Sequence, residues 1–237
     1  MQETHFDVVV VGGGMVGAAL ASGLAQQGFS IAVLEQEQAA EFDAQSDPDV
    51  RISAIGSASV DLLKQLEVWP AIEQMRSAVY RKLETWEWQT ACVSFDAASL
   101  GLPELGYMVE NRVLQRALWQ RLQQQNVTLF CPAGLQNLEQ HNGGWTVMLD
   151  NQQQLSARLV VGADGANSQV RQRAGIGIHG WNYSQSCMLI TIRCEHPAGD
   201  TTWQQFTPQG PRAFLPLFDN WASLVWYDAP ARIRQLQ

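Results

Sequence analysis

Cysteine and histidine are scarce in this sequence of 237 residues, and neither is spaced as a metal site requires. The four cysteines stand at positions 92, 131, 187 and 194, with no C-x-x-C pair among them. None of the four histidines partners a cysteine at zinc-like spacing. We therefore predict no metal ligands and interpret the cysteines as buried or incidental thiols of a reducing compartment. The histidines, interpreted as surface or structural residues rather than catalytic bases, are His5, His141, His179 and His196.

Positive charge is also in short supply, with 15 Lys and Arg against 23 Asp and Glu, a formal net charge of −8 and a pI of about 4.9. This balance argues against a nucleic-acid partner and against simple electrostatic docking to an anionic membrane. No uninterrupted apolar stretch is long enough to span a bilayer, and the N-terminus lacks the basic region and cleavage site of a secretory signal. We expect a soluble cytoplasmic protein of one or two domains.

The most informative stretch is the first 35 residues. An apolar run from Phe6 to Val11 leads directly into Gly12-Gly13-Gly14-Met15-Val16-Gly17. A helical pattern follows and stops at Gly28, and a second apolar run, residues 29–34, ends on Glu35. Strand, glycine turn, helix, strand and acid in this order predict the βαβ unit that binds a dinucleotide. The alternative is a glycine-rich packing turn without a ligand.

Each residue type in this stretch has a physical reason. Gly12 permits the tight turn, Gly14 lets a pyrophosphate approach the backbone, and Gly17 lets the helix pack close to the sheet. The helix N-terminus offers free N–H groups and the positive end of its dipole to phosphates. Glu35, at the carboxyl end of the second strand, can accept hydrogen bonds from ribose hydroxyls and would repel a 2′-phosphate.

The rest of the chain is α/β at first and mostly β after position 178. We predict two lobes: residues 1–78 and 104–178 form the first, residues 179–237 form a β-rich second lobe, and residues 79–103 leave the first lobe to join the second. Strands are predicted near residues 83–95, 127–130, 145–149, 155–161, 187–194, 202–207, 212–217 and 221–227. Helices are predicted after Ser57 or Ser59 and after Asn111.

Three further positions carry candidate functional side chains. Arg51 precedes the first of these helices, either as a solvated surface arginine or as a guanidinium that reaches nucleotide phosphates. Asn111 opens the second helix, where capping alone is the simpler interpretation. Asp164-Gly165 follows a strand and precedes Asn167 and Ser168, either of which can cap a short helix.

These motifs together resemble the FAD-dependent aromatic hydroxylases, single-component flavoprotein monooxygenases typified by para-hydroxybenzoate hydroxylase. The match rests on the glycine turn with Glu35, on Arg51, and on the stretch from Gly162 to Arg171. The resemblance implies that the turn binds the ADP half of FAD, and that the Asp-Gly motif lies near the flavin and the site visited by NAD(P)H. It predicts the following FAD contacts: Gly12, Gly14, Met15, Val16, Gly17, Glu35, Gln36, Arg51, Asn111, Asp164 and Gly165. No catalytic residue is predicted, because in such enzymes the cofactor carries the difficult chemistry.

The fold class implied by the resemblance is α/β, with a Rossmann-like FAD-binding domain of the ββα three-layer type and a mostly β substrate domain. Family members continue well beyond 237 residues, into a Gly-Asp motif that binds the flavin half of FAD. Here Gly199-Asp200 lies among strands rather than before a helix. We therefore expect a member that lacks the C-terminal part of the family fold, keeps the ADP half of the cofactor site, and is inactive alone.

Residues 48–55, 83–88, 106–111 and 210–216 narrow the resemblance to the ubiquinone-biosynthesis branch, and within it to bacterial members that hydroxylate demethoxyubiquinol. This implies a prenylated quinol and O₂ as substrates, with NAD(P)H as the electron donor. Other ubiquinone-biosynthesis proteins and a peripheral association with the inner membrane are left open, and a homo-oligomer is expected. Six of the nine Trp lie in the two β segments, where an aromatic wall would suit a prenylated quinol, although ordinary sheet packing explains any one of them.

Two other functions stay open on the sequence. The chain is either another FAD-dependent oxidoreductase or aromatic hydroxylase on the same scaffold, or a non-catalytic binding or assembly partner. Substrate-dependent NAD(P)H oxidation separates the first of these from the quinol hydroxylase, and failure to bind flavin would favour the second.

Overall fold

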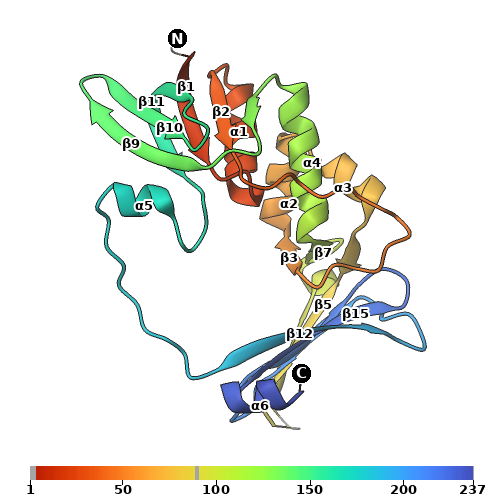
Figure 1. Ribbon diagram of the computed structural model, residues 1–237. Helices are drawn as coiled ribbons and strands as arrows, with labels where there is room; N and C mark the ends of the chain where they lie inside the picture. The colour runs from red at the N-terminus through yellow and green to blue at the C-terminus, as the bar shows by residue number, and fades with distance from the viewer. Residues whose placement is uncertain (1–3, 89–90, 237) are drawn as a thin grey trace. The chain divides into compact units, whose positions relative to one another are not determined.

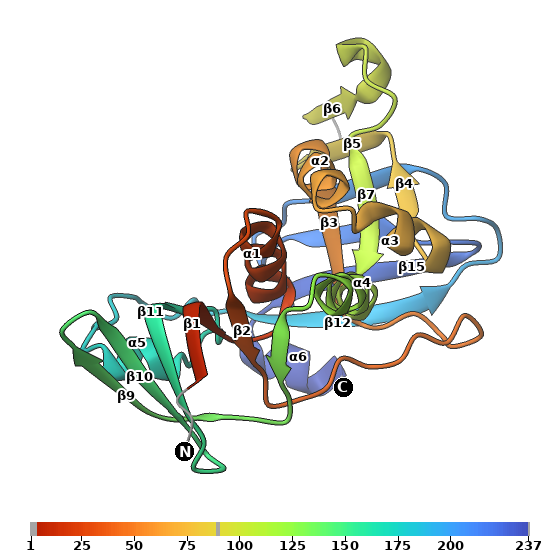
Figure 2. The same cartoon turned by 90° about the horizontal axis from the view of Figure 1, so that it is seen from above.

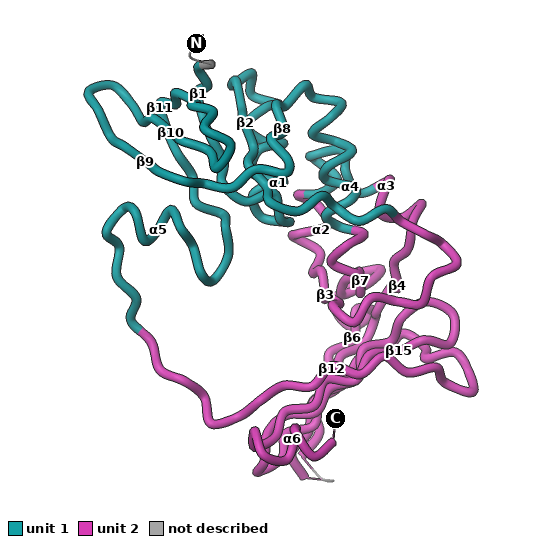
Figure 3. Tube along the Cα trace, in the orientation of Figure 1, with its two compact units in different colours: residues 1–41, 63–69, 114–179 teal, residues 42–62, 70–113, 180–237 magenta. Residues whose placement is uncertain are grey.

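The computed structural model describes residues 4–88 and 91–236. The chain forms two compact units, which are coloured separately in Figure 3. Unit 1 comprises residues 1–41, 63–69 and 114–179, and unit 2 comprises residues 42–62, 70–113 and 180–237. The sequence-based division at residues 78, 103 and 178 concerns the domains of the family, and it stays a prediction.

Unit 1 is built on a six-stranded sheet in the order β8-β2-β1-β11-β10-β9 (Figure 1). The central strand β1 pairs in parallel with β2 and β11, and β2 pairs in parallel with β8. β10 is antiparallel to both β11 and β9. Parallel strands are usually covered on both faces, and Val9, Val10 and Val33 are accordingly fully buried. The strands are β1 (Thr4–Val11), β2 (Ile31–Leu34), β8 (Thr128–Phe130), β9 (Leu135–His141), β10 (Gly144–Leu149) and β11 (Gln154–Gly162).

Helices pack on the strands of unit 1. α1 (Met15–Gln26) packs against β1 and β2, and the short α5 (Gln169–Arg173) packs against β9 and β11 (Figure 2). α4 (Asn111–Gln124) buries Leu114, Leu118 and Leu122, which recur one helical turn apart. The strand, turn, helix and strand predicted from the first 35 residues are confirmed. In the described ranges, no helix is long and apolar enough to cross a membrane.

Unit 2 holds a second six-stranded sheet, in the order β12-β15-β14-β13-β5-β6, and a three-stranded sheet, in the order β3-β7-β4. Within the larger sheet, β5 pairs in parallel with β13, so residues 82–86 share a sheet with residues 201–205. The strands are β3 (Ile52–Gly56), β4 (Ala78–Tyr80), β5 (Lys82–Trp86), β6 (Cys92–Asp96), β7 (Gly106–Glu110), β12 (Ser186–Arg193), β13 (Thr201–Gln205), β14 (Arg212–Pro216) and β15 (Trp221–Asp228). The helices that lie wholly or mostly in this unit are α3 (Trp69–Met75), η1 (Ala97–Leu100) and α6 (Pro230–Leu236). α2 (Ser57–Gln65) and α4 begin in this unit and end in unit 1.

Four strands, β3, β4, β7 and β9, were not predicted from the sequence, and the first and last of them show why. β3 lies between Arg51 and α2, where we expected the helix to follow Arg51 closely, and β9 precedes the predicted turn at residues 142–144. Neither strand has the clean alternation of apolar and polar residues that marks a half-buried strand. β3 is defined by its antiparallel partner β7, and β9 by its partner β10. Tertiary pairing thus decided both elements.

A buried cluster of charges surrounds Glu110, the last residue of β7. Arg76 Nε donates to Glu110 Oε1 at 2.7 Å, and Arg112 Nε donates to Oε2 at 2.9 Å. The Asp49 N–H also donates to Oε2, at 2.7 Å. Both arginines continue to Ser46, Arg76 to its carbonyl at 2.7 Å and Arg112 to its hydroxyl at 3.0 Å. The cluster therefore ties the irregular segment before β3 to strand β7.

Replacing Arg76 with Met should destabilise the protein by about 3 kcal/mol, because removing one partner of a buried ion pair leaves the other charge poorly compensated. The side chains of Arg76 and Glu110 are only 8% and 4% exposed. Urea unfolding measures the loss. The matched control is Arg81→Met, whose ion pair with Asp200 joins side chains that are 48% and 44% exposed, and it should cost less than about 1 kcal/mol. Equal losses in the two variants would contradict the importance of the cluster.

Candidate nucleotide-binding site

The two glycine motifs predicted from the sequence meet in unit 1. β1 and β11 are parallel neighbours, so Val11 and Gly162 end at the same edge of the sheet. The Ala163 N–H donates to the Val11 carbonyl at 2.7 Å. Gly12 has a φ of 105°, and a Cβ on it would collide with the Ala163 carbonyl. Only glycine satisfies both conditions, because other residues rarely adopt this φ and none can avoid the collision.

The N-terminus of α1 is uncapped and open. Gly14 is its N-cap residue in extended conformation, no side chain caps the helix, and its first turn contains no acidic residue. A Cβ on Gly14 would meet nothing within 4 Å, and Val16 is 75% exposed. Gly17, in contrast, is packed so closely that a Cβ would collide with the Gly12 carbonyl. Since first-turn N–H groups have no partners within a helix, this end of α1 is suited to an anion.

Glu35 follows β2 directly and shapes the glycine turn. Its Oε2 accepts the Gly13 N–H at 2.7 Å, and its Oε1 accepts the N–H groups of Gln36 at 2.8 Å and Glu37 at 3.2 Å. An ionised carboxylate offers about four acceptor positions, so capacity remains for a hydroxyl donor. The sequence predicted the position of Glu35 but not this use of its carboxylate. The ribose contact stays a prediction.

Asp164 is turned toward the start of α5. Its Oδ1 accepts the Ser168 hydroxyl at 2.6 Å, and its Oδ2 accepts the Gln169 N–H at 2.6 Å and the Val170 N–H at 3.2 Å. Ser168, one of the two predicted caps, is the N-cap residue of α5, and its hydroxyl oxygen accepts the Arg171 N–H. Gly165 is exposed, with a φ of 78°. The Asp164 carboxylate thus has a structural task at the helix start, and its proximity to a flavin stays a prediction.

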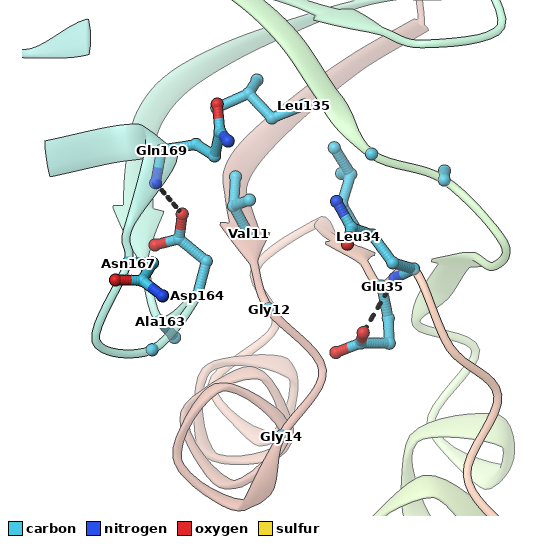
Figure 4. A pocket seen from close by; sticks show the side chains of 14 residues that line it. Val11, Gly12, Gly14, Leu34, Glu35, Leu135, Ala163, Asp164, Asn167 and Gln169 are labelled. Carbon is cyan, nitrogen blue, oxygen red and sulfur yellow. Dashed lines mark hydrogen bonds between the residues drawn. The ribbon is translucent and has the colours of Figure 1, made fainter. Parts of the chain in front are cut away.

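A pocket of about 450 Å³ opens between the two motifs and the segment that follows β8 (Figure 4). The predicted contacts that line it are Gly12, Gly14, Glu35, Gln36, Asp164 and Gly165. Sequence reasoning missed a second group, for which only the cap signal at 167–168 gave any hint. The lining residues in that group are Val11, Leu34, Ala133, Gly134, Leu135, Ala163, Asn167 and Gln169.

Cys131 belongs to the same segment after β8 and carries no redox or nucleophilic signal. Burial raises the pKa of its thiol, and the negative charge of Glu35 raises that pKa further. Both effects favour the neutral thiol, which is a poor nucleophile. The thiol is free, as are those of the other three cysteines.

Arg51 and Asn111 belong to unit 2, where they lie together. The Asn111 N–H donates to the Arg51 carbonyl at 3.0 Å, and the Ser53 hydroxyl donates to Asn111 Oδ1 at 2.6 Å. The Arg51 N–H donates to Asp49 Oδ1 at 3.3 Å. Asn111 is the first residue of α4, as predicted, but its side-chain oxygen is engaged by Ser53. Their predicted contacts with FAD remain predictions.

Comparison with characterised proteins identifies close relatives. The chain is 64% identical over 238 residues to the 3-demethoxyubiquinol 3-hydroxylase of Escherichia coli K12, covering 100% of this chain and 61% of that protein. It is 36% identical over 221 residues to the ubiquinone hydroxylase UbiL of Rhodospirillum rubrum, covering 93% and 51%. It is 34% identical over 245 residues to the human mitochondrial ubiquinone biosynthesis monooxygenase COQ6, covering 94% and 51%. The chain therefore spans 51% to 61% of the length of these relatives.

Solved structures share the fold. PqsL of Pseudomonas aeruginosa, in complex with 2-aminobenzoylacetate, superimposes with a TM-score of 0.84 at 21% identity, covering 98% of this chain and 63% of that one. The p-nitrophenol 4-monooxygenase PnpA of Pseudomonas putida DLL-E4 gives a TM-score of 0.81 at 18% identity, covering 99% and 61%. The predicted α/β fold class is thereby confirmed.

The family follows from a direct match. The model described as an FAD binding domain matches residues 5–226, which is nearly the whole chain and includes both glycine motifs. The chain therefore belongs to the FAD binding domain family of FAD-dependent monooxygenases.

Proposed function

We propose that the chain binds the ADP half of FAD in the pocket of unit 1. We further propose that it is part of a monooxygenase that hydroxylates a prenylated benzoquinol in ubiquinone biosynthesis. The observation that carries the nucleotide site is the meeting of the glycine turn with the Ala163 backbone at the ends of β1 and β11. The substrate class is supported by the 64% identity to a demethoxyubiquinol hydroxylase, over the whole of this chain.

The residues of unit 1 fit the ADP half of FAD. The uncapped start of α1, with Gly14, Met15, Val16 and Gly17, supplies N–H groups and a positive dipole end for the pyrophosphate. The open space beside Gly14 admits a phosphate oxygen close to the backbone. Glu35 and Gln36 line the same pocket, where the spare acceptor capacity of Glu35 suits a ribose hydroxyl. A pocket of about 450 Å³ lies within the usual range for cofactor sites.

The remaining proposed contacts rest on the family resemblance. The Arg51 guanidinium makes no hydrogen bond or ion pair with the described residues, which leaves that group available for a phosphate. Asn111 lies against the Arg51 backbone and presents a polar side chain. Asp164 and Gly165 line the pocket and would lie toward the flavin.

When bound, FAD supplies the oxygen chemistry, with NAD(P)H as the proposed electron donor and O₂ as co-substrate. The work left to the chain is binding and orientation: the turn holds the phosphates, Glu35 holds the ribose, and apolar surface keeps water away. A prenylated quinol partitions into lipid, so we place the working protein in the cytoplasm at the periphery of the inner membrane. Other proteins of the same pathway are its natural partners.

An aromatic row on the larger sheet of unit 2 suits such a substrate. Trp86 and Trp203 have ring centroids 5.2 Å apart, and Trp203 stacks on Phe214 at 5.6 Å with nearly parallel planes. Arg212 lies over the Trp226 ring, with its guanidinium carbon 4.1 Å from the centroid. Flat apolar rings of this kind can pack against a benzoquinol or an isoprenoid tail. The fold is shared with a p-nitrophenol 4-monooxygenase and with a protein that binds 2-aminobenzoylacetate, so the substrate argument rests on sequence identity rather than on architecture.

In a protein extended to the length of its relatives, replacing Glu35 with Ala should weaken FAD binding about tenfold or more. The variant loses a ribose acceptor and the anchor of the Gly13 N–H, and each hydrogen bond is worth about 0.5–1.5 kcal/mol. Flavin fluorescence titration gives the dissociation constant. Glu37→Ala, which removes an exposed carboxylate two residues away, is the control and should bind normally. Unchanged FAD affinity in Glu35→Ala would refute the assignment.

Cells without their own demethoxyubiquinol hydroxylase should regain ubiquinone when they express a protein extended to the length of its relatives. The readout is the quinone profile of lipid extracts. A Gly12→Val variant serves as the negative control, because its side chain would collide with the Ala163 carbonyl. Persistence of the precursor, with protein expressed and flavin bound, would show that the substrate assignment is wrong while the FAD assignment stands.

A polypeptide of these 237 residues alone should retain FAD poorly. The ADP half has its partners in unit 1, but the flavin would lose hydrogen bonds and cover, and each loss of about 1.4 kcal/mol weakens binding tenfold. We also expect self-association, because β6 is an edge strand that exposes Val93 and Phe95 by 54% and 49%. Flavin absorbance after gel filtration and the mass of the eluting species test both. A yellow, stoichiometric monomer that oxidises NAD(P)H with a quinol would contradict this expectation.

A further inference from the structure

The Gly13 peptide groups are held from both sides. Its N–H donates to Glu35 Oε2 at 2.7 Å. Its carbonyl accepts two side-chain donors from α4, Trp119 Nε1 at 2.7 Å and Gln115 Nε2 at 3.1 Å. A Cβ on Gly13 would lie 3.0 Å from Glu35 Cβ and 3.2 Å from Trp119 Cζ2, so the residue is wedged between them. All of these residues belong to unit 1.

These bonds orient two successive peptide planes. In a trans peptide the carbonyl and the following N–H point in opposite directions. Fixing the Gly13 carbonyl toward α4 therefore fixes the Gly14 N–H to point away from α4. Glycine has little intrinsic preference for φ and ψ, so three consecutive glycines would otherwise let these planes rotate. The Gly14 N–H donates to none of the described residues, and Gly14 lines the pocket.

The two donors on α4 are well placed for this task. Gln115 and Trp119 are four residues apart, so they lie on the same face of the helix. Trp119 is 3% exposed, and its indole N–H is buried with the Gly13 carbonyl as its acceptor. A buried indole N–H needs such a partner, and its acceptor here is the carbonyl at the centre of the glycine turn. The helix that carries them is far away in the sequence, 106 residues from Gly13 to Trp119.

We propose that Trp119 and Gln115 are positioning residues for pyrophosphate binding. By holding the Gly13 carbonyl they keep the Gly14 N–H and the start of α1 preorganised for phosphate oxygens, so that no ordering of the turn is needed on binding. This inference rests on the proposed nucleotide site. It extends that site to two side chains that do not line the pocket.

The test uses Trp119→Phe, Gln115→Met and the double variant, each of which keeps most of the side-chain volume and removes the donor. ADP binding to the ¹⁵N-labelled chain is followed by NMR titration, with the Gly14 amide signal as a local reporter. Each single variant should weaken ADP binding about threefold, because one donor remains. The double variant should lose more than the product of the two single losses, because both donors act on one carbonyl.

Adenosine is the second probe, since it lacks the phosphates. The affinity for adenosine should stay within twofold of wild type in all three variants. General damage to the pocket would instead weaken the binding of both ligands alike. Trp145→Phe is the matched control, because Trp145 lies in β10 of the same unit and its indole N–H donates no hydrogen bond to the described residues. Thermal unfolding confirms that each variant is folded.

The outcomes separate the two claims. Unchanged ADP affinity in the folded double variant, or equal losses for ADP and adenosine, overturns the positioning role. A wild-type chain that binds neither ADP nor adenosine overturns the proposed nucleotide site itself, and with it this inference. Selective loss of ADP binding, with a shifted Gly14 amide signal in the free double variant, supports both.

Discussion

The nucleotide site depends on one close approach between two backbones. The turn after β1 and the turn after β11 lie so near each other that the Ala163 carbonyl occupies the place of a side chain on Gly12. The approach is possible because β1 and β11 are parallel neighbours and end together, and because Ala163 donates to the Val11 carbonyl. A side chain at position 12 would push the two turns apart and distort the pocket that both of them line. Backbone sterics, rather than any charge, thus set the first condition for this site.

Charged side chains then fix what the glycines leave free. A run of three glycines permits a sharp turn but specifies no single conformation. Glu35 supplies part of the missing definition by accepting three backbone N–H groups, one of them from Gly13. Asp164 does the same for the second turn, where it accepts from Ser168, Gln169 and Val170. Both acids are therefore part of the framework of the pocket as well as of its lining.

Unit 2 uses a related device on its own irregular segment. Residues 42–51 contain no helix or strand, yet Glu110 and the arginines beside it bind the backbone of this segment at several points. Arg76 also lies over the Phe218 ring, with its guanidinium carbon 4.4 Å from the centroid. Buried charge here replaces the regular hydrogen bonds that a strand or helix would have provided. The segment leads directly to Arg51, whose backbone is held by Asp49 and Asn111.

Local periodicity and turn chemistry were enough to predict the βαβ unit, a helix cap at Asn167 or Ser168, the apolar stripe of α4 and the strands of the larger sheet of unit 2. It also placed Glu35 and Asp164 at the ends of strands. Long-range packing brings Trp119 and Gln115 to the Gly13 carbonyl, turns the Asp164 carboxylate toward α5, and makes strands of β3 and β9. Each of these depends on a partner that no local pattern identifies. A donor 106 residues away finds its acceptor only after the sheet and helix have packed, since packing alone brings the two groups within hydrogen-bonding distance.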